Sequence, residues 1–523
     1  MVIMLGLDLL LVALVPFGPQ APDTAAVPAA PGHPPATMPR VEGRPALFET
    51  SDRCMACHNG LTTPAGEDMS IGFEWRASMM ANSARDPYWQ AAVRREVMDH
   101  PEAQGFIEDK CSTCHMPMAR YEAHLAGEQG QVFENLPVGT GGPRRTALAA
   151  DGVSCATCHQ ITAEGLGDAS SFTGGFRVDE AAAWGERTIF GPFETDSGRA
   201  HLMNSATGFT PREAGHMQSS ELCATCHTLY TESLDDQGNQ VGELPEQVPY
   251  LEWRHSSYAR SDSAMSCQTC HMPVVEDPVP VTSVLGQDRE QVSRHVFRGG
   301  NFFMLGMLNR YRNELGTEAL PQEMDAAVRR TLDHLQSDAA SLALDAETRD
   351  DELVAEVTVV NLAGHKLPTA YPSRRAWLQF TVRDAAGEVV FESGGLDPSG
   401  AIRGNDNDED PAAFEPHYRE ITRPDQVQIY EPILLDFRDE VTTGLLFGVR
   451  YGKDNRILPA GFDKETAEPD VAVQGGARDD PDFVGGSDRV RYRVPVSGVR
   501  PPLAVEVALW YQPIGFRWAR NLE

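Results

Sequence analysis

The chain has 523 residues, enough for two or three domains with buried cores. Its formal net charge is −32, from 76 acidic and 44 basic residues. A surface this acidic disfavours nucleic acid and anionic membranes as partners, whereas cationic patches on other proteins fit it.

The N-terminal region has the composition of a leader. Residues 1–17 are apolar except for Asp8, and the chain is then rich in Pro and Ala to about Pro39. This pattern predicts a signal peptide and linker over 1–40, cleaved near 25–30. Because no Lys or Arg precedes the apolar run, an uncleaved N-terminal anchor stays open as the one form of membrane association. No other stretch approaches the roughly 20 apolar residues that cross a bilayer.

One pattern, Cys-x-x-Cys-His, occurs five times and uses all ten cysteines of the chain. Two thiols spaced to add to the vinyl groups of one porphyrin, with an imidazole directly after them, are typical of c-type haem attachment. Zinc sites and thioredoxin-like pairs need no such histidine, and disulfides are the remaining alternative. We therefore predict five covalent haems c. The cysteines are Cys54, Cys57, Cys111, Cys114, Cys155, Cys158, Cys223, Cys226, Cys267 and Cys270, and the proximal iron ligands are His58, His115, His159, His227 and His271.

The segments around these motifs are rich in Gly, Pro, Asp and Ser, which predicts loops. A helix is expected after Asp86, a favourable N-cap with Pro87 at the first helical position. Residues 41–286 are thus predicted to form a loop-rich, α-helical haem-binding domain with closely spaced haems. Helical spacing returns over 287–344, where a second helix begins at about Pro321, so we expect a helical segment that packs on the haem domain.

After Asp345 the apolar residues alternate with a period of two. Such runs occur at 353–359, 378–382, 490–496 and 503–509, separated by Gly, Pro and Asp. They predict an antiparallel β-sandwich domain over 345–523. The acidic tract 405–410 lacks the spacing of an EF-hand loop, so we interpret it as a solvated loop.

The sixth iron ligands decide whether each haem is closed or can bind a small molecule. Ten histidines remain beyond the proximal five, enough to close every site. Four lie in suitable segments: before the fourth motif, before the fifth, in a Gly-rich turn, and in a loop stiffened by prolines. We predict these as distal ligands: His216, His255, His295 and His365. Further candidates are His124, His201 and Met80, with hydrogen-bonding or surface histidines and a core methionine as the alternatives. We interpret His334 as a helix-surface or hydrogen-bonded residue.

Together, the five motifs, the 75–81 segment, the Glu252-Trp253 pair and the 364–369 loop resemble an exported multihaem (pentahaem) cytochrome c family. Over the haem region the chain is similar to the superfamily of tetrahaem nitrifier cytochromes and hydroxylamine oxidoreductase. This resemblance implies closely stacked haems, mostly with histidine on both faces, and respiratory electron transfer.

The sequence favours a periplasmic or extracellular electron carrier that meets redox partner proteins, as an oligomer or in a larger respiratory complex. One alternative is an oxidoreductase that acts on a small nitrogen or sulfur compound at an open haem, so whether the protein is an enzyme stays open. No Cys-x-x-Cys-Lys variant, of the kind found in pentahaem nitrite reductases, occurs. Another alternative is a filament-forming cytochrome.

Overall fold

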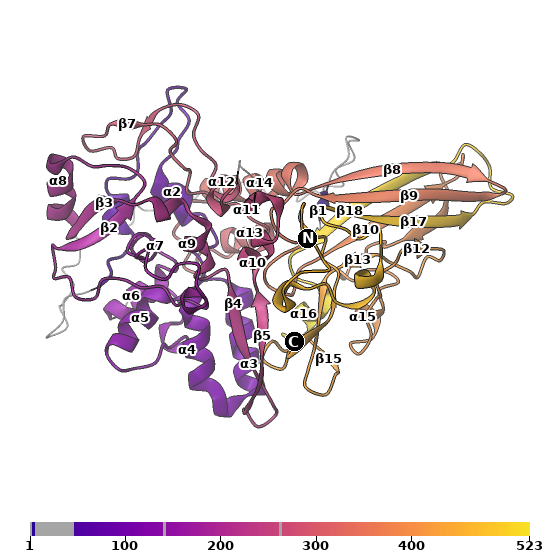
Figure 1. Cartoon of the computed structure of the whole chain (residues 1–523), viewed down its shortest axis with the longest axis horizontal. Coiled ribbons are helices and arrows are strands. Elements are labelled where there is room, and N and C mark those ends of the chain that lie inside the picture. The colour runs from indigo at the N-terminus through magenta and orange to yellow at the C-terminus, as the bar shows by residue number, and fades with distance from the viewer. Residues whose placement is uncertain (1–2, 6–46, 140–142, 261–263) are drawn as a thin grey trace, which may run out of the picture.

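The structure is a computed structural model that describes residues 3–5, 47–139, 143–260 and 264–523. The predicted signal peptide lies outside the described residues except for strand β1 (Ile3–Leu5), which pairs with a strand near the C-terminus. The chain combines helices with several small sheets, and its N-terminal and C-terminal halves lie side by side (Figure 1). Within the described ranges, no helix has both the length and the apolar character needed to cross a membrane.

The N-terminal half consists of short helices joined by long loops. Its helices are α1 (Asp52–Met55), α2 (Ile71–Arg76), α3 (Pro87–Asp99), α4 (Gln104–His115), α5 (Pro117–Leu125), α6 (Arg144–Ala150), α7 (Cys155–Cys158), α8 (Ser197–Thr207), α9 (Ser220–Ala224), α10 (Pro249–Arg254), α11 (Ser257–Arg260) and α12 (Cys267–His271). Three strand pairs join them: β2 (Arg187–Gly191) with β3 (Phe209–Glu213), β4 (Leu229–Leu234) with β5 (Gln240–Gln247), and β6 (Val279–Pro280) with β7 (Asp288–Arg289). The predicted cap of α3 is confirmed, because the Asp86 carboxylate accepts the N–H groups of Tyr88 and Trp89.

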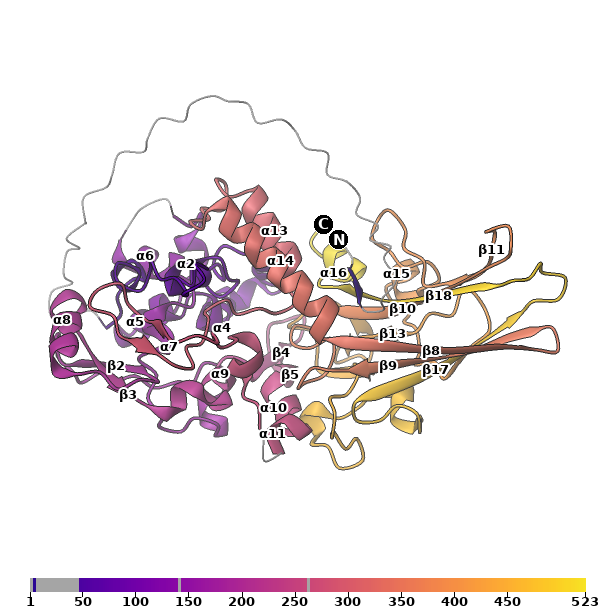
Figure 2. The same ribbon diagram turned by 90° about the horizontal axis from the view of Figure 1, so that it is seen from above.

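Two helices connect the halves. α13 (Phe302–Arg310) and α14 (Pro321–Asp338) pack against each other through Leu305, Leu308 and Met324, and both were predicted. Figure 2 shows the pair lying across the boundary between the two halves. α14 runs directly into the first long strand, which begins at Ala340, ahead of the expected domain start at residue 345.

Strands dominate the C-terminal half. They are β8 (Ala340–Arg349), β9 (Glu352–Asn361), β10 (Arg375–Arg383), β11 (Val389–Ser393), β12 (Glu420–Ile421), β13 (Ile429–Tyr430), β14 (Pro432–Leu435), β15 (Val441–Thr442), β16 (Arg450–Asp454), β17 (Ser487–Pro495) and β18 (Ala504–Gln512), with the short helices α15 (Asp406–Glu409) and α16 (Phe516–Arg520). One sheet has the order β1-β18-β10-β11, with β13 also on β10; a second has the order β12-β17-β9-β8; and a third has the order β15-β14-β16. The pairs are antiparallel except that β12 runs parallel to β17.

The first two sheets share one buried core. Alternate residues of β9 and β17 are buried, as the period of two predicted, and they meet the inner face of β10 and β18. At the centre, Phe380 of β10 and Tyr492 of β17 stack with ring centroids 4.0 Å apart, and neither side chain is exposed. This contact joins the two sheets face to face.

The interpretation of the acidic tract as a solvated loop is wrong in part: 406–409 form α15, and although residues 406, 409 and 410 are exposed, residues 405, 407 and 408 are buried. Asp408 is buried and forms a bidentate ion pair with Arg375, at 2.7 and 2.8 Å, and also accepts the N–H of Ile402. The carboxylate is needed there because the Arg375 guanidinium is buried on β10 and requires a counter-charge. Sequence spacing alone did not reveal that partner.

We expect the Phe380→Ala substitution to lower the free energy of unfolding by about 3–5 kcal/mol, because it leaves a cavity between the sheets. Urea denaturation of the holoprotein, followed by far-UV circular dichroism, measures the change. Val389→Ala, at a position that is 49% exposed on β11, serves as the control and should change stability by less than about 0.5 kcal/mol. Equal effects of both substitutions would contradict the shared core.

Candidate haem sites

All five Cys-x-x-Cys-His segments line one cavity of about 1320 Å³ in the N-terminal half and at its border with the β half. The lining includes every one of the ten cysteines and the five histidines that follow them. Each cysteine is free, so no disulfide joins them in this structure. Small-molecule pockets usually have about 300–1,000 Å³, and this cavity is larger.

Each motif is held as about one helical turn. In the first, third and fourth motifs the histidine N–H donates to the carbonyl of the first cysteine, at 2.9–3.0 Å. The other two motifs end α4 and form α12. Residues three apart lie on one face of a helical turn, so both thiols of a motif point the same way. A single planar group with two attachment points fits this spacing.

The ring orientation of four of the five proximal histidines is set by backbone carbonyls. Nδ1 lies 2.6 Å from the Val281 carbonyl in His58, 2.8 Å from that of Ser83 in His115, 2.6 Å from that of Phe190 in His159, and 2.5 Å from that of Arg298 in His271. Nδ1–H donates in each, which leaves the Nε2 lone pair free, as iron ligation requires. Burial lowers the pKa of His115 and of His271 to about 4, so both rings are neutral at pH 7.

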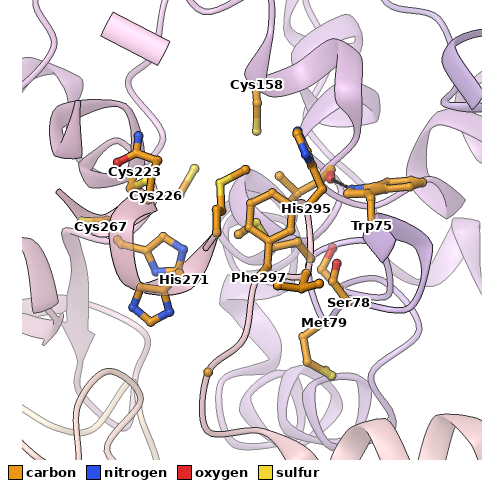
Figure 3. Close-up of a pocket in the computed structure, with 18 of the residues that line it drawn as sticks. Trp75, Ser78, Met79, Cys158, Cys223, Cys226, Cys267, His271, His295 and Phe297 are labelled. Carbon is orange, nitrogen blue, oxygen red and sulfur yellow. Dashed lines mark hydrogen bonds between the residues drawn. The ribbon is translucent and has the colours of Figure 1, made fainter. Parts of the chain in front are cut away.

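Thiols of different motifs lie close together. Cys54 is close enough to Cys155 to raise the pKa of its thiol, and the same holds for Cys114 beside Cys226 and for Cys267 beside Cys223. These contacts link the first motif to the third, the second to the fourth, and the fourth to the fifth. Figure 3 shows thiols of the third, fourth and fifth motifs around one space together with His271 and His295. Groups attached at these thiols would therefore be direct neighbours.

Two of the predicted distal histidines face proximal ones across the cavity. The ring centroids of His159 and His295 are 6.3 Å apart with planes inclined by 17°, and those of His271 and His365 are 6.2 Å apart and inclined by 16°. Two metal–nitrogen bonds of about 2 Å, plus the distance from each Nε2 to its ring centre, give about 6 Å. The Nδ1 atoms of His295 and His365 lie 3.2 and 2.9 Å from backbone carbonyls, which orients both rings. Both pairs fit an iron between them.

His334 was not predicted as a ligand, yet it lies at the cavity. This residue of α14 lines the cavity, its ring centroid is 6.4 Å from that of His271, and its Nδ1 lies 3.0 Å from Asp338 Oδ2. His271 can have only one partner opposite it, and the close match between the two pairs described above favours His365. The signal in the sequence was the carboxylate four residues after the histidine, a helical spacing that suits a ligand and its orienting group.

Four other predicted ligands are not brought to the cavity. Nε2 of His216 lies 2.9 Å from the Ile161 carbonyl, and Nε2 of His124 lies 2.6 Å from Asp109, so the nitrogen that would bind iron is occupied. His255 packs on a phenylalanine ring outside the lining, and His201 is exposed on α8. Met80 does line the cavity, as does Met79, so its role stays a prediction.

The number of histidines in the cavity limits how many irons can have histidine as their sixth ligand. Among the described residues, three histidines beyond the proximal five line it: His295, His334 and His365. Each can close one iron, so at least two of five irons would have another sixth ligand or none. The expectation that histidines close every site is therefore not met by the described part of the chain.

A second group with metal-ligand spacing lies in the β half. The ligand atoms of His417, Asp480 and Asp488 are within 4.8 Å of one another. Gln428 and Asn455 both donate to His417 Nδ1, since their amide oxygens accept backbone N–H groups. The ring proton is therefore on Nε2, 3.1 Å from Asp480 Oδ2. This cluster is satisfied as a buried hydrogen-bond network.

We expect His295→Ala to convert one haem of the holoprotein from low-spin to high-spin, because it removes the group opposite His159. Electron paramagnetic resonance and the absorbance band of high-spin ferric haem measure this. His216→Ala is the matched control and should leave the spin states unchanged, since its Nε2 is bonded to a carbonyl. The reverse pattern would show that the assignment of these two histidines is mistaken.

No protein-family model and no curated protein matches this chain. Among solved structures, the chain is similar to a penta-heme cytochrome c552 from Thermochromatium tepidum, with 17% sequence identity, a TM-score of 0.48, and a match that covers 91% of this chain and 94% of that one.

Proposed function

We propose that this protein is an exported multihaem cytochrome c that moves electrons through five covalently attached haems c. The observation that carries the proposal is the convergence of ten thiols and five imidazoles on one cavity, four of the imidazoles oriented by backbone carbonyls. A c-type haem supplies one-electron chemistry at its iron when bound. The chain supplies the thiols that tether it, the neutral imidazoles that orient it, and apolar walls that exclude water.

The size of the cavity supports an apolar occupant. An enclosed cavity costs about 24 cal/mol per Å³, so 1320 Å³ would cost at most about 30 kcal/mol, an upper limit because part of it opens to solvent. A domain is stable by only about 5–15 kcal/mol in total. Filling the space with covalently held, flat apolar groups removes this cost and makes the occupant part of the hydrophobic core.

The proposal includes the organisation of the chain: a leader over 1–40, a haem domain over 41–286, helices over 287–344 that pack on it, and a β-sandwich domain over 345–523. It also includes export to the periplasm or cell surface, because haem c is attached outside the cytoplasm. The acidic surface suits redox partner proteins with cationic patches.

A second candidate function is an oxidoreductase with an open haem. It is favoured by the count of histidines, since the described chain brings only three distal candidates to five sites. An iron without a protein ligand on one face can bind a small nitrogen or sulfur compound.

The intact mature protein should exceed the polypeptide mass by five haems. The double substitution Cys155→Ala with Cys158→Ala should reduce this to four, because the third motif then has no thiol. Mass spectrometry of the purified holoprotein and its variant measures both values. A mature chain without added haem mass would refute the proposed function.

Without haem, we expect the chain to lose this fold, because an unfilled cavity of this size costs up to about 30 kcal/mol, against the roughly 5–15 kcal/mol by which a domain is stable. We expect protein made in cells that lack the haem-attachment machinery to show no cooperative thermal transition and rapid proteolysis over 47–286. The same chain made with that machinery is the control. A protease-resistant apoprotein with a sharp transition would contradict the cavity argument.

Cyanide separates the two candidate functions. If one haem is open, a high-spin ferric signal should be present and should become low-spin when cyanide is added. If all five haems are closed, cyanide should change neither the resonance nor the absorbance spectrum, and the oxidoreductase candidate is rejected.

A further inference from the structure

Three sequence patterns occur twice in the same order. Ser-(Asp/Glu)-x-Cys-x-x-Cys-His stands at 51–58 and 220–227, Glu-Trp-Arg-x-Ser at 74–78 and 252–256, and Ser-Cys-x-Thr-Cys-His at 154–159 and 266–271. We call these two sets the first unit and the second unit. Each contains two haem motifs and one Glu-Trp-Arg segment, and the motif at 111–115 belongs to neither.

The two units make the same backbone contact between the first haem motif and the Glu-Trp-Arg helix. In the first unit, the N–H of Gly72 lies 3.4 Å from the carbonyl of His58. In the second, the N–H of Tyr250 lies 3.4 Å from the carbonyl of His227. Both N–H groups come two residues before the glutamate, so α2 and α10 sit in the same register on their motifs.

The tryptophan of each segment donates a hydrogen bond to the backbone just before the other haem motif of its unit. Trp75 Nε1 donates to the carbonyl of Val153 at 3.0 Å, and Trp253 Nε1 donates to that of Met265 at 2.9 Å. Each carbonyl belongs to the residue two positions before the first cysteine of that motif. The first cysteines also meet in both units, as the thiol contacts above show. Sequence and geometry therefore describe one two-haem arrangement used twice.

The glutamate of each unit reaches the loop that carries a distal histidine. Glu74 Oε2 accepts the N–H of His295 itself at 2.9 Å, and its Oε1 pairs with Arg294 Nε at 2.6 Å. This carboxylate is only 7% exposed.

Glu252, which has no exposed surface, does the same in the second unit. Its Oε2 accepts the N–H of Lys366 at 3.1 Å and the hydroxyl of Thr369 at 2.5 Å, and its Oε1 lies 2.9 Å from Arg456. Lys366 directly follows His365, so this carboxylate also holds the backbone beside a distal histidine.

We propose that Glu74 and Glu252 are equivalent positioning residues, which hold the loops that present His295 and His365 to the irons opposite His159 and His271. The proposal rests on the proposed function, because it assigns these glutamates a role in haem ligation. A buried carboxylate is costly unless it is fully paired, and each of these is paired to the ligand loop and to an arginine. Each glutamate thereby fixes the distance between its ligand loop and its Glu-Trp-Arg helix. The tryptophan of the same helix fixes that helix to the motif that carries the proximal histidine.

Glu74→Gln and Glu252→Gln in the holoprotein test this. Glutamine keeps the shape but loses the charge and one acceptor, so the ligand loop loosens. Each variant should convert one of five haems to high-spin, the double variant two, and added imidazole should restore the low-spin signal by replacing the displaced ring. Glu323→Gln is the control: this residue pairs with Arg76 of the first segment, at 2.6 Å, and within the described residues its carboxylate bonds to Arg76 and to the N–H of Leu320 and not to either distal loop, so all low-spin signals should remain.

The mass of attached haem distinguishes failure of the proposed function from failure of the positioning role alone. Absence of five attached haems would refute the proposed function, whereas five haems with unchanged spin states and potentials in both folded glutamine variants would overturn the positioning role alone. If the glutamine variants do not fold, Glu74→Asp and Glu252→Asp decide, because they keep a charge to pair with the arginines but shorten the reach to the loop. Unchanged midpoint potentials and resonance signals in both aspartate variants would also overturn the proposal.

Discussion

The structure depends on walls that keep an apolar space open while presenting imidazole nitrogens to it. A cavity lined by flexible segments would close, because a protein interior gains dispersion energy wherever atoms move together to fill a void. The chain resists collapse with short, strongly connected pieces: one helical turn per motif, and ring nitrogens tied to backbone carbonyls. Each tie fixes a tautomer as well as an orientation, so the nitrogen that faces the cavity is the one able to bind a metal.

The β half contributes to the same space. It extends the loop that carries His365 into the cavity, and a buried network holds that loop to the N-terminal half. Lys366 pairs with Asp454 at 2.6 Å, and Asp454 also pairs with Arg456, which in turn meets Glu252. Two cations and two anions balance in this network, all of them buried. Such a network is stable only when complete, so it specifies one relative placement of the halves.

The motif at 111–115 has different surroundings from the two repeated units. Burial raises the pKa of the Cys111 thiol, and the charges of Glu246 and Glu96 raise it further. Burial also raises the pKa of Glu96 to about 7, and the rings of Tyr88 and Tyr371 lie nearby with centroids 6.2 Å apart. This motif therefore faces a carboxyl group that titrates near neutral pH and two buried phenols that keep their protons. No distal histidine faces His115 among the described residues, in contrast to His159 and His271.

The sequence by itself determined what depends on local chemistry. Cys-x-x-Cys-His can be interpreted without a fold, because the spacing of two thiols and an imidazole matches one attachment chemistry. The cap at Asp86 and the alternation in β9 and β17 were equally visible, since helix starts and half-buried strands follow from neighbouring residues.

Only the tertiary structure decided which histidines meet. His216 and His295 have similar local sequence support, yet one is bonded to a carbonyl and the other faces His159. His334 was overlooked because its role depends on where α14 crosses the cavity, more than 60 residues after the last motif. Contacts between distant segments arise from packing of the whole chain, so they cannot be inferred from a pattern within a few residues. The Glu-Trp-Arg repeat is visible in the sequence. The role that we propose for it depends on the tertiary structure, in which both glutamates contact ligand loops far along the chain.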